Sequence, residues 1–469
     1  MEINPTFAEY LAEAAGESNA RVASEALSGP ASVSIRLNPS KVTQPWDVAA
    51  GQITGMSVSS VPWSSCGFFL PERPVFTLDP LMHAGCYYVQ DSSAMFVGNV
   101  FRRILGQVLE AHDNTRPLRV LDLCAAPGGK TTDLAASLRM SGCRSWLLVS
   151  NEIMKQRATV LADNAGIWGD PAVVVTSADP KAFASMRGWF DIIVADVPCS
   201  GEGMFRKDEE AVAQWSADNV ALCQARQRRI LADVWPALAP GGIMVYSTCT
   251  FNRMENDGNV EWCASVLGAE VVDIADTHPG ILNTSCGCSL IPGLVPGEGQ
   301  YCAALRKSGD AEYSRTGLKP DKARNMGEAA VPKDVREKIC GWFTSRVSVS
   351  MKGGMIIAVP VELEPEISHL EYLHPLLRGT AVGQLKGRDI VPDADMALSI
   401  MLGEDAFPDV EVTREQALAF LHKDTLTLTG AEKGIILLKY CGHPLGFVKN
   451  LGNRCNNLHP QNRRIRMNI

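Results

Sequence analysis

Two cysteines have the residue type and spacing to carry out covalent chemistry in this 469-residue chain. Cys199 lies in the peptide DVPCSGEGMF and Cys249 in YSTCTF, and each follows a hydrophobic run that predicts a β-strand. A thiolate is a strong nucleophile, but a thiol with its usual pKa near about 8.5 must first lose its proton. Two such strands in one parallel sheet would bring both thiols to the same edge, and their spacing leaves open which one attacks.

Acidic residues end several of the predicted strands, and a glycine-rich turn follows the first of them. The turn LDLCAAPGGK (121–130) lacks both the GxGxxG dinucleotide pattern and the GxxxxGK(S/T) phosphate loop. Glu152, at the end of the second strand, is placed to accept hydrogen bonds from ribose hydroxyls, and Asp179 is placed to accept one from an adenine amino group. These positions predict an adenosine-containing ligand at the sheet edge.

Short β-branched runs alternate with helical stretches between about residues 118 and 275, which indicates an open, doubly wound and mostly parallel α/β sheet. We expect a small α+β region before this sheet and a mainly β module after it. The predicted divisions are 1–115, an N-terminal region; 116–306, the α/β domain; 307–333, a polar linker; and 334–469, a C-terminal module.

Composition narrows the class of protein further. The net charge of −8 argues against nucleic-acid binding over the whole surface, although local basic patches remain possible. No apolar run is long enough for a membrane span, and the acidic first segment does not resemble a signal peptide. The 14 cysteines are scattered without CxxC pairs, so we expect free thiols in the cytoplasm and no bound metal.

Basic residues are concentrated in two places. One is a predicted helix between the cysteine motifs, where a solvated face is the simpler interpretation of Arg226, Arg228 and Arg229. The other is the C-terminal segment 449–469, which has no acidic residue and which we expect to contact phosphates. Its basic residues are Lys449, Arg454, Arg463, Arg464 and Arg466.

The motifs resemble those of the NOL1/NOP2/Sun family of RNA (cytosine-5) methyltransferases. The resemblance runs in the family's order through segments 122–130, 151–152, 179, 196–203 and 247–250, and segment 85–95 is similar to the family's sequence before the core. The C-terminal stretch PLGFVKNLGNRCNN resembles the extra PUA-like RNA-binding module of bacterial members that modify small-subunit ribosomal RNA. This resemblance implies a class I methyltransferase fold that uses S-adenosylmethionine. It also implies that 1–115 is an RNA-docking region, 116–306 the catalytic domain and 334–469 an RNA-binding module.

The resemblance also implies roles for individual residues. Cys249 would add to carbon 6 of a cytosine, Cys199 would assist release after methyl transfer, Asp196 would contact the pyrimidine, and Lys130 would orient Asp196 or the base. The cofactor would be held by these residues: Cys124, Ala125, Ala126, Pro127, Gly128, Gly129, Lys130, Glu152, Asp179 and Asp196. The target cytosine would have to be unpaired or flipped out of its helix.

One departure from the family lies after Gly299, where the family usually has an aromatic residue and this chain has Gln300. We interpret it as a strand-edge variation without catalytic consequence. We expect a monomer that methylates 16S ribosomal RNA. Transfer RNA as the substrate, and a noncatalytic RNA-binding assembly factor, remain alternatives. A DNA cytosine methyltransferase is disfavoured because that family places its nucleophile in the Pro-Cys motif.

Overall fold

The architecture comes from a computed structural model that describes residues 4–309, 328–329, 331–387 and 389–468. Most of the predicted linker, at 310–327, therefore lies outside the described residues. Among the described helices, none is both long and apolar enough to cross a lipid bilayer.

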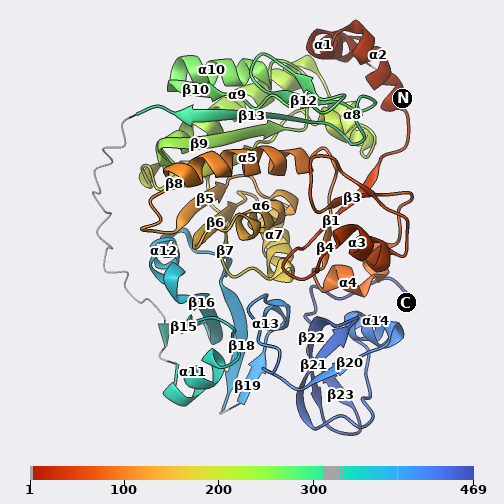
Figure 1. Cartoon of the computed structure of the whole chain (residues 1–469), viewed down its shortest axis with the longest axis vertical. Coiled ribbons are helices and arrows are strands. Elements are labelled where there is room, and N and C mark those ends of the chain that lie inside the picture. Colours follow the sequence, from red (N-terminus) through yellow and green to blue (C-terminus); the bar gives the residue numbers. More distant parts are fainter. Residues whose placement is uncertain (1–3, 310–327, 330, 388, 469) are drawn as a thin grey trace.

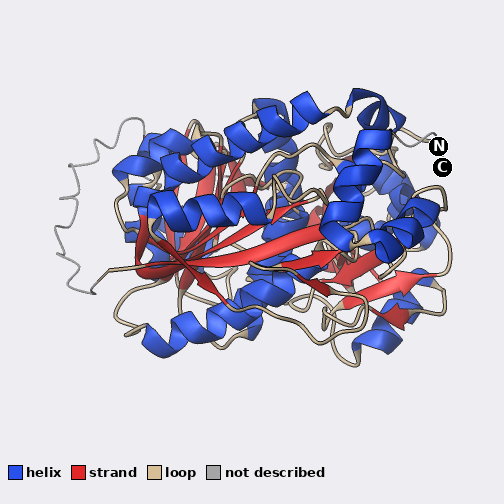
Figure 2. Cartoon of the chain, turned by 90° about the horizontal axis from the view of Figure 1, so that it is seen from above, coloured by secondary structure: helices blue, strands red, loops and turns tan. Residues whose placement is uncertain are grey.

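A central mixed sheet forms the middle of the molecule, with helices on both faces (Figure 2). Its strand order is β11-β12-β13-β9-β8-β5-β6-β7-β17, and β10 pairs with β13. The pairs β9/β8, β8/β5, β5/β6 and β6/β7 are parallel, and the remaining pairs are antiparallel. The parallel strands are β5 (Leu118–Asp122), β6 (Trp146–Asn151), β7 (Val173–Thr176), β8 (Phe190–Asp196) and β9 (Leu238–Thr248). The antiparallel strands are β10 (Ala269–Val272), β11 (Leu282–Asn283), β12 (Cys288–Leu290), β13 (Gln300–Lys307) and β17 (Leu377–Arg378). The doubly wound α/β fold class is confirmed, with five adjacent parallel strands inside a sheet that is mixed as a whole.

The parallel strands are buried on both faces, as expected for crossover connections that place helices on either side. Their Val, Ile and Leu side chains form one hydrophobic core with the apolar faces of the flanking helices. The helices of this domain are α5 (Met95–Ala111), α6 (Gly129–Met140), α7 (Lys155–Trp168), α8 (Glu209–Gln214), α9 (Ala217–Val234) and α10 (Asp257–Leu267).

The N-terminal region consists of a four-stranded antiparallel sheet with short helices, preceded by a separate helix pair. Phe7 of the first helix contacts Phe205 and Trp215 at ring-centroid distances of 5.1 and 5.5 Å, so this pair packs beside the loop that follows the first cysteine motif. The elements are α1 (Pro5–Ala15), α2 (Glu17–Ala26), β1 (Val33–Leu37), α3 (Trp46–Thr54), β2 (Ser59–Ser60), β3 (Gly67–Leu70), α4 (Pro80–His83) and β4 (Tyr87–Val89).

The chain from residue 328 onward contains two sheets, and their first strand, β14, lies within the predicted linker 307–333. The first has the order β14-β15-β16-β18-β19, and its neighbour β17 pairs with β7 at the edge of the central sheet. Its elements are β14 (Glu328–Ala329), α11 (Lys333–Cys340), β15 (Val347–Lys352), β16 (Met355–Pro360), α12 (Glu364–His369), β18 (Thr380–Lys386), β19 (Asp389–Pro392) and α13 (Ala394–Leu398).

The second sheet lies beside the N-terminal sheet, although the two are far apart in the sequence (Figure 1). Side chains from the two regions form a single buried hydrophobic cluster that includes Leu37, Phe68, Phe420 and Val448. Its elements are β20 (Asp409–Glu411), α14 (Arg414–His422), β21 (Gly434–Tyr440), β22 (His443–Asn450) and β23 (Cys455–Asn457).

Candidate active site

The sequence-predicted site residues meet at one edge of the central sheet. Strands β5, β6, β8 and β9 are adjacent and parallel, so their carboxyl ends bring together Asp122, Glu152, Asp196 and Cys249. Asp179 follows β7, the next strand of the same edge, and its side chain caps the short helix after it by accepting from Lys181 N at 2.9 Å.

The glycine-rich turn between β5 and α6 is held in place by α7. Gly128 has φ of +116°, which favours glycine, and α6 begins at the next residue. Asn164 donates to the Pro127 carbonyl and Arg157 to the Ala126 carbonyl, both at 2.8 Å. Arg157 also forms an ion pair with Glu152 at 3.2 Å. The turn is thus preformed, with Cys124 and Ala125 buried or half-buried at its start.

Polar atoms without hydrogen-bond partners lie at this edge of the sheet, as a binding site for a nucleoside would require. Asp122 is fully buried, and its Oδ2 accepts from Thr131 Oγ1 at 2.6 Å, but its Oδ1 has no partner among the described residues. Ser177 Oγ, just after β7, also has none. Ile153 and Met154 are about half exposed beside Glu152, at 51% and 56%, and offer an apolar surface. These features fit the adenosine group of S-adenosylmethionine.

The two cysteines lie side by side, although they come from different loops. Their Sγ atoms are 3.3 Å apart, within hydrogen-bond distance for sulfur. The hydrogen bond with Cys249 and burial both raise the pKa of the Cys199 thiol well above its ordinary value. Cys199 is therefore protonated at neutral pH, and either sulfur can be the donor in this pair.

Asp196 and Lys130 form an ion pair next to the thiols. Lys130 Nζ lies 2.9 Å from Asp196 Oδ2. Burial opposes the charge of Lys130, but the Asp196 carboxylate outweighs it, and the pKa of Lys130 is raised. Ser247 Oγ donates to Asp196 Oδ1 at 2.7 Å. The carboxylate is thus held in one orientation at the mouth of the site.

Gln300 was interpreted from the sequence as a strand-edge variation without catalytic consequence, and the structure places it next to Asp196. Its Nε2 donates to Asp196 Oδ1 at 3.2 Å, so it contacts the candidate catalytic carboxylate directly. The residue begins β13, which pairs with β9 through Tyr301 and Thr248. In the sequence, Gln300 could have been noticed because it follows a glycine at the start of a strand. Only the pairing of β13 with β9 brings it to the site.

Two buried glutamates that the sequence did not single out connect the cysteine loops. Glu202 Oε2 accepts from the backbone N–H groups of Phe251 and Asn252 at 2.6 and 3.1 Å. Glu255 Oε2 accepts from Ser200 N at 3.0 Å. Each carboxylate therefore ties the loop after Cys199 to the loop after Cys249, and Glu202 could have been noticed because it lies within the first motif.

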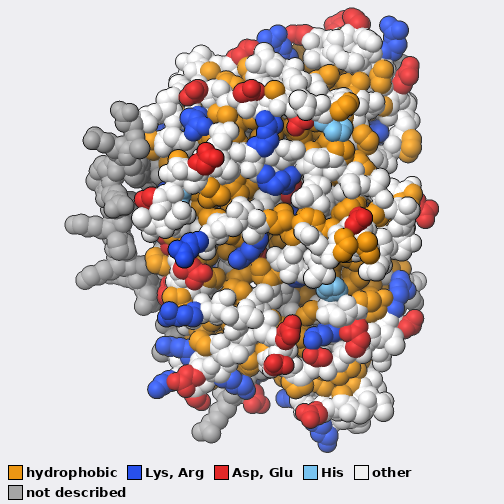
Figure 3. All heavy atoms as spheres, in the orientation of Figure 1, with side chains coloured by type: hydrophobic (Ala, Val, Ile, Leu, Met, Phe, Trp, Pro, Cys, Tyr) orange, Lys and Arg blue, Asp and Glu red, His pale blue; other side chains and the backbone are white. Residues whose placement is uncertain are grey.

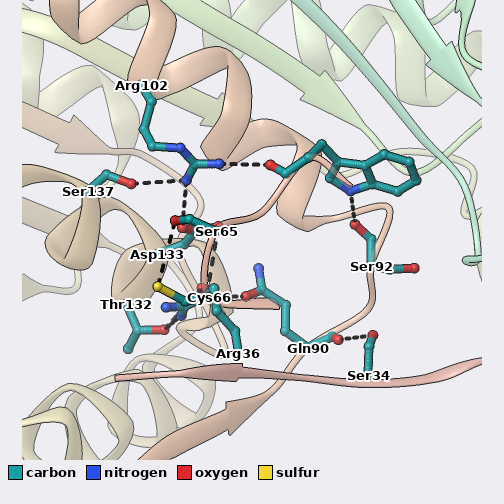
Figure 4. A network of polar contacts seen from close by, with 12 residues as sticks. Ser34, Arg36, Ser65, Cys66, Gln90, Ser92, Arg102, Thr132, Asp133 and Ser137 are labelled. Atoms are coloured by element: carbon teal, nitrogen blue, oxygen red, sulfur yellow. Dashed lines mark hydrogen bonds and ion pairs between the residues drawn. The ribbon is translucent and has the colours of Figure 1, made fainter. Parts of the chain in front are cut away.

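The N-terminal sheet reaches the cofactor turn through a buried arginine (Figure 4). Arg36 of β1 donates to Thr132 Oγ1 at 2.5 Å and to the Gly129 carbonyl at 3.3 Å. It also donates to Gln90 Oε1 at 2.7 Å and lies 3.8 Å from Asp133. The first turn of α6 is consequently fixed by a residue almost 100 positions earlier.

The basic residues of the C-terminal segment divide into two groups. Arg463 is only 12% exposed and forms ion pairs with Asp163 and Asp395 at 3.2 and 2.7 Å, so its expected role as a phosphate contact is wrong. The others are exposed and form no ion pair with any described residue: Lys449, Arg454, Arg464 and Arg466. On the helix between the motifs, Arg228 packs over Trp262 and donates to Asn259 at 2.9 Å.

Comparison with known proteins matches three parts of the chain. Residues 106–306 match the family model of the 16S rRNA methyltransferase RsmB/F, residues 3–92 match the N-terminal domain of 16S rRNA methyltransferase RsmF, and residues 407–465 match the methyltransferase RsmF PUA domain. Residues 106–306 form an RsmB/F methyltransferase domain. The resemblance seen in the motifs is confirmed, and the family makes the chain a methyltransferase.

Relatives of the RsmB/F family match along almost the whole chain. The chain is 29% identical over 450 residues to the ribosomal RNA small subunit methyltransferase F of Shewanella loihica, covering 92% of this chain and 89% of the relative. The protein of that name from Klebsiella pneumoniae is 28% identical over 446 residues, covering 91% and 89%.

Solved structures agree with this fold. A methyltransferase homologue from Pyrococcus horikoshii superposes with a TM-score of 0.53 and 26% identity, over 65% of this chain and 95% of that one. NSun6 from the same organism has a TM-score of 0.52 at 18% identity, over 66% and 99% of the two chains, and supports the fold. The class I fold implies S-adenosylmethionine as the methyl donor.

Proposed function

We propose that this enzyme methylates carbon 5 of a cytosine in 16S ribosomal RNA, with Cys249 as the nucleophile. The observation that carries the proposal is the contact between two thiols at the strand ends beside the Lys130–Asp196 ion pair. The full-length similarity to proteins named ribosomal RNA small subunit methyltransferase F supports this RNA as the substrate.

The chemistry begins with attack on the base. The Cys249 thiolate forms a bond to carbon 6, and the electron pair of the 5,6 double bond moves toward carbon 5 and the N3 side of the ring. S-adenosylmethionine supplies the methyl group that carbon 5 accepts. Asp196, held by Ser247 and Lys130, contacts the base edge where charge develops.

Release follows from the coupling of the thiols. The pKa of Cys199 is raised first of all by its hydrogen bond with Cys249. Once Cys249 is a thioether, the hydrogen bond that raises the pKa of Cys199 is lost and only burial still raises it. Cys199 then releases its proton to water, and its thiolate removes the proton from carbon 5. The electron pair of that C–H bond restores the double bond, and the Cys249 thiolate leaves.

We expect opposite results from the two alanine variants. Cys249→Ala should abolish methyl transfer and any covalent adduct, whereas Cys199→Ala should accumulate enzyme bound to RNA. Denaturing electrophoresis after incubation with cofactor and either 16S RNA, small-subunit particles or transfer RNA measures the adduct. Bisulfite sequencing then locates the modified cytosine.

Cys340→Ala is the control, because Cys340 is an exposed thiol outside the site. It should behave as the unmodified enzyme. Adduct formation by Cys249→Ala would refute the assignment of the nucleophile. No methyl transfer to any of the three RNA substrates would favour a noncatalytic assembly factor.

A further inference from the structure

Gln300 is an almost completely buried amide at the edge of the site, with an exposed fraction of 2%. It begins β13, and the antiparallel register that pairs Tyr301 with Thr248 continues toward Cys249. The loop before it is clamped to the first cysteine loop, since Arg206 forms a buried ion pair with Glu298 at 2.7 Å. Gln300 therefore has a fixed position close to the nucleophile.

Only one of the two polar atoms of this amide forms a hydrogen bond with a described residue. Its Nε2 donates to Asp196 Oδ1, but no described group donates to its carbonyl Oε1. Because Nε2 is committed to Asp196, the orientation of the amide is set and Oε1 is left as a free acceptor. Oε1 is not one of the buried polar atoms that lack a partner, so it reaches solvent and a ligand that donates to it takes the place of water.

The carboxylate of Asp196, next to Gln300, also consists of hydrogen-bond acceptors. Asp196 Oδ1 is occupied by Ser247 and Gln300, and Asp196 Oδ2 faces Lys130. The edge beside the nucleophile thus offers acceptor oxygens from two side chains. Cytosine carries a donor, its exocyclic amine, where uracil carries an acceptor, the O4 carbonyl.

We infer that Gln300 is a specificity-determining residue that selects cytosine over uracil. Its Nε2 orients Asp196, and its Oε1 accepts a hydrogen bond from the exocyclic amine of the target cytosine. This inference rests on the proposed function. Uracil would place its O4 opposite Gln300 Oε1 and Asp196, and two acceptors that face each other leave both unpaired.

Two substitutions separate the roles of the amide. Gln300→Met keeps the approximate length and removes both polar groups. It should lower the rate of adduct formation on cytosine by about tenfold to 100-fold and lower the preference for cytosine by at least about tenfold. Gln300→Glu keeps an acceptor but loses the donor to Asp196, so it should lose rate while it retains the preference.

The probes are small-subunit RNA transcripts that contain 5-fluorocytidine, naked or reconstituted with small-subunit proteins. Fluorine at carbon 5 blocks the elimination step and traps the adduct. After the trapped nucleotide has been mapped, a second transcript carries 5-fluorouridine at that position. Adduct rates on the two transcripts give the preference of each variant, and calorimetry with S-adenosylmethionine checks that the cofactor site is intact.

Gln52→Leu is the matched control, because Gln52 is an exposed amide on α3. It should leave both the rate and the preference unchanged. An unchanged preference in Gln300→Met, with cofactor binding intact, would overturn the inference even though the enzyme methylates cytosine. If the unmodified enzyme forms no adduct on 5-fluorocytidine RNA and transfers no methyl group, the proposed function itself fails.

Discussion

At the scale of single residues, burial at the edge of the sheet changes the pKa of the Asp122 carboxyl group. Burial raises the pKa of Asp122 to about 7, despite the hydrogen bond from Thr131. Its pKa in the unfolded chain is about 3.9. Between these values the unfolded chain is ionised and the folded enzyme holds the proton, so the contribution of Asp122 to stability is lost as the pH rises from about 4 to about 7.

Asp122→Asn should remove this loss. The free energy of unfolding of the variant, relative to that of the unmodified enzyme, should increase between pH 4 and pH 8 by on the order of a few kcal/mol. Urea unfolding of the cofactor-free proteins over this pH range measures the difference.

Asp113→Asn provides a control of opposite sign. Asp113 is exposed, and hydrogen bonds from Thr115 lower its pKa. Its replacement should therefore give no gain in stability with rising pH. A difference between Asp122→Asn and the unmodified enzyme that stays constant from pH 4 to pH 8 would show that Asp122 is ionised in the folded enzyme.

At the scale of elements, three loops meet around the thiols. One loop follows β8, the second follows β9, and the third precedes β13. Gly203 lies where the three loops touch. Gly203 N donates to the Cys249 carbonyl at 2.8 Å, and a Cβ atom at this position would lie 2.7 Å from that oxygen and 2.9 Å from the Glu298 carbonyl. Both neighbours are backbone atoms, so neither can rotate away.

Gly203→Ala should therefore displace the loop that carries Cys249. A shift of about 1 Å can cost about 100-fold in rate, and we expect a loss of adduct formation of that order. The rate of trapping on 5-fluorocytidine RNA measures it.

Gly201→Ala is the matched comparison in the same loop. Gly201 has φ of +77°, but a Cβ atom there would meet nothing within 4 Å. Alanine should cost about 1–2 kcal/mol of stability through its backbone conformation and leave the trapping rate nearly unchanged. Equal trapping rates for the two variants would mean that the contact at Gly203 does not position Cys249.

At the scale of the whole molecule, the two ends of the chain hold the catalytic domain between them. The N-terminal sheet and the PUA sheet share one hydrophobic cluster, and Arg463 joins the C-terminal segment to Asp163 of α7 and Asp395 of α13. The face shown in Figure 3 mixes acidic and basic side chains. On that face the basic side chains do not form one continuous surface, and we expect phosphate contacts from individual exposed residues.

Substitutions of the neighbouring residues Arg463 and Arg464 should distinguish a role in packing the C-terminal segment against the rest of the protein from a role in RNA binding. Arg464→Gln removes an exposed charge and should reduce the slope of log affinity against log salt by about 1, with stability unchanged. Arg463→Gln leaves Asp395 without its cation and should cost about 1–3 kcal/mol of stability. Filter binding to 16S RNA at several salt concentrations and urea unfolding measure the two effects. If Arg463→Gln alters only the salt slope, the docking role is wrong.

The sequence by itself determined the parallel sheet, the strand ends and the identity of the thiols. Alternating β-branched runs and helical stretches predict crossover units, and the carboxyl ends of such strands must share one edge. The family resemblance extended this to a methyltransferase, which the comparisons confirm. The separate roles of Cys249 and Cys199 remain predictions.

Only the tertiary structure decided which distant residues complete the site. Gln300 reaches Asp196 because β13 pairs antiparallel with β9, and Arg36 reaches the first turn of α6 because the N-terminal sheet packs against it. Arg463 proved to be a docking residue because its acidic partners come from two other helices. Local patterns predict the elements, but contacts between residues far apart in the sequence depend on how those elements pack.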